Sequence, residues 1–369
     1  MLRFAVSGIL LATAAYGQSG FSAAYDNGRQ VKLKGAITRI EWTNPHAFLF
    51  IDVPDPAGTT ANWAVEIGNP LDLEDAGWNP TAAHIGDIVD VDGIPARGDG
   101  KQAFAKSVTL ARTGTKLFPP SAKALSAAAA SAPAPRWPDG QVRLGPPPGR
   151  KGYWGSPTKS ALFERAGGAP VSLNDEGLLA NLSDADRVAP LQPWAKAVYL
   201  YRQRTLLKDD PFNRCLPPGG PRQFQTPHGF QFVEQRELGR ILVLLGGGDR
   251  NWRIIYTDGR PPGQSAEQVL TYYGASVGRW EKKETLRVEA SGFNEHFWFA
   301  NGGLPHTEAL RLTERFSRPD MNTLKYDVTV DDPRAYTRPW TGGWNIPWVS
   351  DQDIREYFCE ENAESTFIH

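Results

Sequence analysis

Alternating apolar and polar residues in the second half of the chain predict a series of β-strands. In residues 324–330 the even-numbered residues are apolar, and the odd-numbered residues between them are polar. Side chains of a strand point alternately to its two faces, so this strand has one apolar and one polar face. Similar segments recur across residues 223–362. They predict about eight to ten antiparallel strands in a larger C-terminal barrel, of lipocalin type, or in a sandwich.

The first half predicts a second, smaller β domain over residues 28–118. Its apolar segments of strand character are residues 31–42, 47–53, 62–67, 88–94 and 104–110. A short helix is expected at 69–77, where a polar start precedes Gly77. Three strands, a helix and two strands is the order of an OB-type barrel. With 37 Gly and 30 Pro in the chain, we predict a mainly β protein with few helices.

Two segments without strand periodicity separate these domains. Residues 119–160 are rich in Ala, Ser and Pro and include the run from Gly145 to Gly149, so we predict a linker. Residues 161–222 are expected to form a helical and irregular connector. Its most helix-like part is 193–208, where apolar residues recur near helical spacing.

Residues 1–17 have the pattern of a signal peptide. Arg3 precedes an apolar run, and the small residues Ala15 and Gly17 place the cleavage site between Gly17 and Gln18. The run is too short to span a bilayer, and no later segment approaches ~20 apolar residues. We therefore expect a periplasmic or secreted mature protein without an integral membrane segment.

The chain has two cysteines, Cys215 and Cys359. In an oxidising compartment such a pair predicts one disulfide. Two free buried thiols are the alternative.

The segment 306–316 contains the best candidates for chemistry. If it is a strand, His306, Glu308 and Glu314 share a face that is otherwise apolar. A buried carboxylate can have a raised pKa and act as an acid or base, here with His306 as its partner. The alternative is structural. Glu314 would pair with an Arg of a neighbouring strand, and His306 would cap the turn after Pro305.

Aromatic residues near this segment suggest a binding site. The predicted ligand-binding residues are Asn294, Trp298, Tyr326, Trp280 and Trp344. Aromatic walls with a few polar groups suit a small, mostly apolar ligand. Ordinary core packing of a barrel is the alternative explanation of the same aromatics.

Other classes of function receive little support from the sequence. The net charge of -1 does not favour nucleic-acid binding, and the OB-like domain is acidic in its middle. The six histidines lack metal-ligand spacing, and His46 stands alone after a proline, so no metal or cofactor is expected. The run Gly246–Gly248 lacks the pattern of a phosphate loop and predicts a hairpin turn.

Several short motifs resemble those of a large group of uncharacterised exported bacterial proteins. In the smaller domain the motif is Trp42-Thr43-Asn44-Pro45-His46-Ala47. In the larger domain the motifs are Gly292-Phe293-Asn294, Pro305-His306-Thr307-Glu308-Ala309-Leu310, Thr313-Glu314-Arg315-Phe316 and Asp331-Asp332-Pro333. The resemblance implies a periplasmic, β-rich protein and carries no established activity.

Three functions are therefore open from the sequence. The first is binding of a small hydrophobic or aromatic molecule in the C-terminal barrel. The second is an enzyme that uses Glu308 or Glu314 with His306 for acid–base chemistry. The third is an envelope scaffold or interaction protein, with an unknown protein partner docked by the N-terminal module. A filled barrel with paired polar groups would favour the third.

Overall fold

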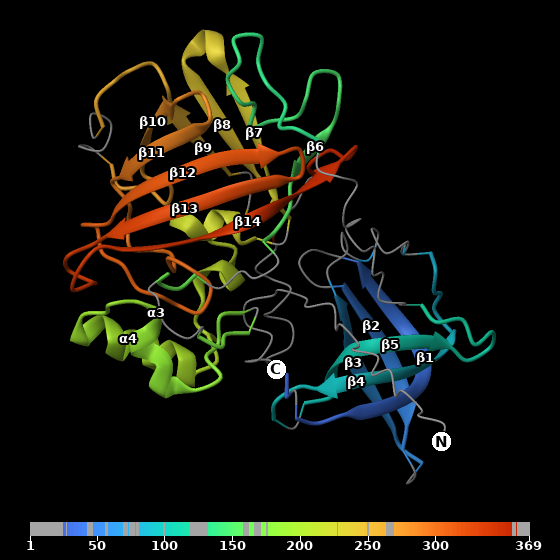
Figure 1. Cartoon of the computed structure of the whole chain (residues 1–369). Helices are drawn as coiled ribbons and strands as arrows, with labels where there is room; N and C mark the ends of the chain where they lie inside the picture. The colour runs from blue at the N-terminus through green and yellow to red at the C-terminus, as the bar shows by residue number, and fades with distance from the viewer. Residues whose placement is uncertain are drawn as a thin grey trace, which may run out of the picture.

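The computed structural model of the chain contains two closed β-barrels, one small and one large (Figure 1). It describes residues 25–26, 28–42, 47–55, 58–68, 73, 78, 81–98, 100–117, 132–157, 162–165, 171–174, 176–226, 228–248, 251–262, 269–355 and 359. The prediction of a mainly β protein with an OB-like N-terminal barrel and a larger C-terminal barrel is confirmed. The residues of the predicted signal peptide lie outside the described part.

The small barrel has five strands: β1 (Val31–Trp42), β2 (Ala47–Pro54), β3 (Thr60–Gly68), β4 (Ile88–Pro95) and β5 (Gln102–Leu110). Their order is β1-β2-β3-β5-β4, and β4 pairs with β1 to close the barrel. Only β3 and β5 run parallel. This is the arrangement expected of an OB-type barrel. Most of the segment 69–77, where a helix was expected, lies outside the described residues.

The large barrel has nine strands: β6 (Gly152–Trp154), β7 (Phe230–Gln235), β8 (Arg240–Leu245), β9 (Trp252–Tyr256), β10 (Ala275–Glu281), β11 (Thr285–Ser291), β12 (Arg311–Asp320), β13 (Thr323–Asp331) and β14 (Trp340–Ser350). Their order is β10-β11-β12-β13-β14-β6-β7-β8-β9, and β9 returns to β10. All neighbours are antiparallel except β9 and β10. The ladder between these two consists of the pairs Ser276–Ile255 and Val277–Tyr256.

The segment expected to be a linker contributes to the large barrel. Its strand β6 lies between β14 and β7. Residues 132–151, which we call the capping segment, pack across the end of the barrel where the β10–β11 and β12–β13 hairpins turn. There Val142 N donates to Lys283 O, and Met321 N donates to Ala132 O. Residues 118–131 lie outside the described part.

The expected connector contains the helical elements. They are η1 (Leu182–Asp184), α3 (Ala185–Val188), α4 (Pro193–Arg204), η2 (Pro211–Arg214) and η3 (Gly220–Phe224), and η4 (Arg236–Leu238) follows between β7 and β8. The helix expected over 193–208 is α4, and it ends at Arg204. Leu206 and Leu207 have φ angles of 54° and 62°, a left-handed conformation that a helix cannot continue through. Among the described residues, no helix has the length and apolar character needed to cross a bilayer.

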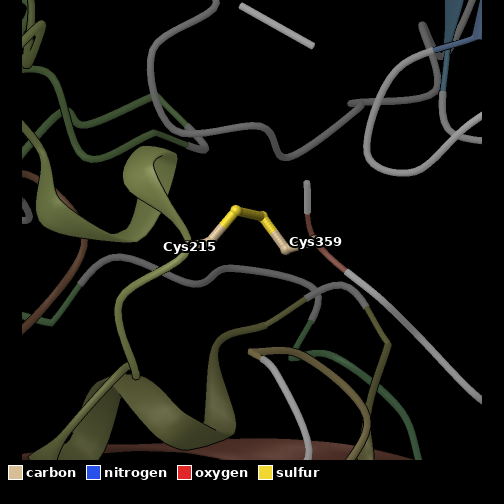
Figure 2. Close-up of a disulfide and its surroundings, with 2 residues drawn as sticks. All are labelled: Cys215 and Cys359. Atoms are coloured by element: carbon tan, nitrogen blue, oxygen red, sulfur yellow. A yellow bond between two sulfur atoms is a disulfide. The ribbon is translucent and has the colours of Figure 1, made fainter. Parts of the chain in front are cut away.

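The predicted disulfide between Cys215 and Cys359 is confirmed (Figure 2). The two Cα atoms are 5.5 Å apart, and 144 residues separate them in sequence. Cys215 directly follows η2 and has a left-handed backbone conformation. The bond therefore joins the irregular stretch after α4 to the end of the described chain.

Candidate functional site

A buried ion pair lies inside the large barrel. The alternation of β12 places Glu314 on the inner face between Leu312 and Phe316. Arg253 reaches it from β9, with Nη1 donating to Oε1 at 3.1 Å and Nη2 donating to Oε2. Glu314 is 0% exposed and Arg253 is 2% exposed. The pair is therefore removed from solvent, and the charge of the carboxylate is balanced at close range.

Two more buried residues complete the hydrogen bonds of this pair. The hydroxyl of Tyr326 donates to Glu314 Oε1 at 2.9 Å, and Arg253 Nε donates to Ser276 Oγ at 2.9 Å. Burial raises the pKa of Tyr326, and the charge of Glu314 raises it further, so the phenol remains a neutral donor. Burial alone would lower the pKa of Arg253, but the charge and hydrogen bonds of Glu314 raise it. We call Arg253, Ser276, Glu314 and Tyr326 the barrel network.

The barrel network crosses one of the shortest ladders of the large barrel. Arg253 is on β9 and Ser276 is on β10, and these strands share only two residue pairs. Through Glu314 and Tyr326 the same arginine is also tied to β12 and β13. The side chains therefore join strands where backbone pairing is sparse, which is a structural role.

Aromatic side chains fill the space beside the network. Phe224 of η3 enters next to the start of β7, with its ring centroid 4.8 Å from Phe230, 5.4 Å from Phe316 and 4.9 Å from Tyr326. The ring of Tyr326 also stacks on Trp344 at 5.5 Å. Phe224 thus closes the interior from the end opposite to the capping segment.

The inward residues of β12 and β13, together with Leu310 just before β12, retain almost no accessible surface. None is more than 2% exposed among Leu310, Leu312, Glu314, Phe316, Leu324, Tyr326, Val328 and Val330. A side chain that lined a space larger than a water molecule would keep some accessible surface. The interior around these residues is therefore packed.

His306 does not lie on the strand with Glu314, because β12 begins at Arg311. Its Nε2 donates to the carbonyl of Asn294 at 2.9 Å, and its ring packs against Phe297 with centroids 4.2 Å apart. Burial lowers the pKa of His306, although the bond to Asn294 opposes this. A neutral ring with its proton on Nε2 satisfies this arrangement.

The residues around His306 are fixed by hydrogen bonds to the turn after β13. Asp332 accepts from the backbone nitrogen of Thr307 at 2.6 Å and from its hydroxyl at 2.9 Å. The hydroxyl of Tyr336 donates to Pro305 O at 2.7 Å. Three of the motifs noted in the sequence, around Asn294, Thr307 and Asp332, therefore hold one another in place.

Glu308 is exposed in a turn, and its backbone nitrogen donates to Glu295 Oε1 at 3.1 Å. In the described part of the chain, no hydrogen bond joins His306 to Glu308 or Glu314. The three residues predicted to be catalytic thus occupy three different environments. They are the barrel interior, a packed loop and the surface.

The predicted ligand-binding residues are also divided. Tyr326 and Trp344 meet in the barrel core, and Asn294 meets His306 outside it. Trp298 is buried under the guanidinium of Arg202, which lies 4.6 Å from its ring. Trp280, on β10, is partly buried against the core.

The capping segment is held by a second set of polar groups, which are partly buried. Glu234 Oε2 accepts from the backbone nitrogens of Leu144 and Gly145, each at 3.0 Å, and Oε1 accepts from Trp137 Nε1 at 3.1 Å. A side chain at Gly145 would not fit, because its Cβ would lie 2.5 Å from Phe232 O. Burial raises the pKa of Glu234, against the effect of these hydrogen bonds.

Arg318 binds the same segment from β12. Its guanidinium donates to the carbonyls of Arg143 at 3.1 Å and Gly145 at 2.9 Å. It also lies 4.6 Å from the ring of Trp154 and 4.5 Å from that of Trp348. Burial lowers the pKa of Arg318 to about 10. One carboxylate and one guanidinium thus bind the capping segment, in addition to its backbone hydrogen bonds to the two hairpins.

Sequence reasoning missed Arg253, Arg318, Glu234 and Arg222. The three arginines are at buried positions and Glu234 is half-buried. Arg222 forms a further buried pair with Asp210, with Nη1 donating to Oδ1 at 2.7 Å. Arg253 carried a signal in the sequence, because it is the only charged residue in the apolar stretch Trp252–Tyr256. Because an unpaired buried charge is costly, an inward-facing arginine on one strand predicts an inward-facing carboxylate on another.

Several buried polar atoms in the segments before β7, β9 and β10 have no hydrogen-bond partner in the described part of the chain. They include Gln225 Nε2, Thr226 Oγ1, Asn251 Nδ2 and Tyr273 OH. Within the described ranges, no three His, Cys, Asp or Glu side chains are close enough to share a metal ion. His46 lies outside those ranges.

These features define a class of protein: two β-barrels, the larger one closed around a neutralised polar network and covered at one end by its own chain. Residues 8–105 match the model of a family of unknown function, DUF6152. The matched range includes β1 to β4 and the start of β5. No curated protein and no solved structure gives a significant match to the chain.

Proposed function

We propose that this is an exported envelope protein that acts through its surfaces, as a scaffold or interaction protein, rather than through a site inside the barrel. The observation that carries the proposal is the packed interior around Glu314, whose charge is balanced by Arg253. Acid–base catalysis requires a carboxylate within reach of the substrate, and ligand binding requires a pocket. The packing around Glu314 supports neither requirement.

Export is supported by the disulfide between Cys215 and Cys359, since such bonds persist in oxidising compartments. The signal peptide over residues 1–17 remains a prediction. Cell fractionation followed by N-terminal sequencing of the mature protein tests it. We expect a periplasmic or secreted protein that begins at Gln18, and a cytoplasmic protein that keeps Met1 would overturn export.

The small barrel is the proposed docking module. Two large apolar residues three positions apart are exposed where β4 begins: Ile85, before the strand, at 72%, and Ile88, its first residue, at 43%. Groups of exposed apolar residues often mark a protein contact. They support a partner that covers this edge of the module.

Photo-crosslinking in the native envelope tests the docking role. A crosslinking residue is placed at Ile85 or Ile88, and the matched control is placed at Lys32, which is exposed on β1 of the same barrel. We expect one discrete crosslinked product from the first two positions and none from the control. Equal products from all three positions, or none from any, would contradict docking at this edge.

A ligand at the end of the large barrel is the second candidate function. The unpartnered atoms of Gln225, Thr226 and Asn251 favour it, because buried polar atoms are usually hydrogen-bonded. Native mass spectrometry of protein purified from its own periplasm separates the two functions. The interaction proposal predicts a disulfide-bonded polypeptide without a bound small molecule. A stoichiometric small molecule that is lost in a Thr226→Val, Asn251→Leu variant would replace it with ligand binding.

A further inference from the structure

The outer surface of the large barrel differs sharply between its two sides. On β11, β12 and β13 the outward residues are mostly polar and form ion pairs. Examples are Arg287 with Glu289 at 2.5 Å, Arg315 with Glu281 at 3.4 Å and Lys325 with Asp327 at 3.1 Å. This side, which includes the strands at the front of Figure 1, is built to face water.

On β7, β8 and β9 the outward residues include a central apolar group, with Gln231, Gln235, Arg240 and Tyr256 around it. We call Val233, Leu242, Leu244, Trp252 and Ile254 the apolar face. They are direct neighbours in the sheet, because Leu242 pairs with both Val233 and Ile254, and Leu244 pairs with Trp252. All five retain exposed surface, and Trp252 is 58% exposed.

The barrel core does not use the apolar face. The inward residues of the same strands, such as Phe232, Val243 and Ile255, are at most 1% exposed and already fill the interior. Strands that are apolar on both faces are usually covered on both. In the described chain, the apolar face lacks a second layer.

We propose that a second copy of this chain covers the apolar face, with the two β7–β9 sheets packed face to face. Within these three fully described strands, the one carboxylate is Glu234, and it binds the capping segment. The one outward charge is Arg240. Arg240 is the first residue of β8 and donates to Gln235 Oε1 at 2.7 Å, beside the apolar face. The five residues of the apolar face carry no charge, so two copies can pack them together without opposing like charges, and they offer no charge for an acidic or basic partner to recognise. Packed sheet faces are a common arrangement of such surfaces.

The size of the apolar face predicts a weak dimer. Three strands about 4.8 Å apart and five residues of about 3.3 Å each give a sheet area on the order of a few hundred Å² per copy. Stable complexes bury roughly 800 Å² per partner. We therefore expect reversible association in the micromolar range. The inference goes beyond the proposed function, because it does not involve the small barrel or its partner.

Sedimentation velocity of the mature, disulfide-bonded chain tests the proposal. Across about 1 to 300 µM, which brackets a micromolar Kd, we expect a shift from monomer to dimer. Trp252→Lys and Leu244→Lys should each abolish the shift. The matched control is Trp194→Lys on α4, since Trp194 is 44% exposed and should leave the dimer intact.

Near-UV circular dichroism establishes that each variant is folded. Because Trp252 is largely exposed, its variant remains informative even where Leu244→Lys does not fold. A chain that is monomeric over the whole range would overturn the proposal. A dimer that survives Trp252→Lys, or one that is lost equally in Trp194→Lys, would also overturn it.

Discussion

Replacing Glu314 by Gln is expected to lower the free energy of unfolding of the large barrel by about 3–5 kcal/mol, the usual effect of breaking a buried pair. The substitution keeps the shape of the side chain but removes its charge. Arg253 would then be a buried cation at 2% exposure, with no solvent to replace the lost carboxylate. Gln can still accept from Tyr326, so the loss reports mainly on the charge of Arg253.

A double variant measures the coupling directly. Glu314→Leu with Arg253→Met removes both charges and fills similar volume with apolar groups. Unpaired hydroxyls remain on Ser276 and Tyr326, at about 1–3 kcal/mol for a buried group without its partner. In a double-mutant cycle, the stability lost by the double variant should be smaller than the summed losses of Glu314→Leu and Arg253→Met. We expect a difference of at least about 2 kcal/mol.

The assay is urea unfolding with the disulfide intact, followed by near-UV circular dichroism. The matched control is Glu281→Gln, because Glu281 is a half-exposed carboxylate on the outer face that contacts Arg315. Exposed pairs of this kind contribute about 0–1 kcal/mol. If Glu314→Gln costs no more than Glu281→Gln, or if the losses of Glu314→Leu and Arg253→Met simply add, Glu314 and Arg253 do not form a coupled unit.

Three other changes have expected outcomes. Cys215→Ser opens a loop of 144 residues and should lower the free energy of unfolding by up to about 5 kcal/mol in the chain-entropy model. Wild type under reducing agent is the control, and unchanged unfolding of the variant in urea would refute the prediction. Burial lowers the pKa of His228 to about 4, so the native state holds a neutral ring. The contribution of His228 to the free energy of unfolding is then present above the ordinary pKa of 6.5 and is lost as the pH falls toward 4. It amounts to at most about 3 kcal/mol, and to less because the ring keeps some exposure. In urea titrations from pH 7 to 4, His228→Gln should have a shallower decline than wild type or the exposed control His296→Gln, and parallel curves would contradict the argument. Burial raises the pKa of Glu234, so its contribution to the free energy of unfolding is present at low pH and is lost as the pH rises above the ordinary value of 4.5. Glu234→Gln should therefore gain stability relative to wild type between pH 4 and 7. A difference in stability that stays constant across that range would count against this argument.

Local periodicity was enough to predict both barrels and the inward position of Glu314. The alternation of apolar and polar residues in β12 and β13 is visible within each strand's own sequence, so each strand can be predicted without knowing which strand it pairs with. The capping segment lacks such a repeat. Its conformation depends on Glu234 and Arg318, which lie far away in sequence and supply the hydrogen bonds that its own backbone does not. The proline-rich composition therefore predicted a linker, whereas the capping segment packs against the end of the large barrel.

The candidate site was predicted only in part, for a related reason. The hypothesis that an arginine pairs with Glu314 identified the type of partner. The sequence did not reveal that the arginine comes from β9, 61 residues away and three strands around the barrel. His306 and Glu308 were placed on the strand because the even-numbered pattern extends through them. Asp332 binds Thr307 through backbone and side chain, so the ladder begins only at Arg311.

The barrel network also explains how β9 finds its register. Hydrophobic burial normally fixes register, because a slip of one residue turns apolar side chains outward. On β8 and β9 that penalty is weak, since Leu242, Leu244 and Ile254 would be acceptable inside the barrel as well. A one-residue slip would, however, move Arg253 to the outside and leave Glu314 buried without its counter-charge. The ion pair thus makes a single register favourable where the apolar pattern alone permits two. The double variant Glu314→Leu, Arg253→Met is therefore expected to keep most of its stability but to populate more than one register of β9. We expect multiple resonances for β9 amides in NMR spectra, whereas one sharp set would refute this role.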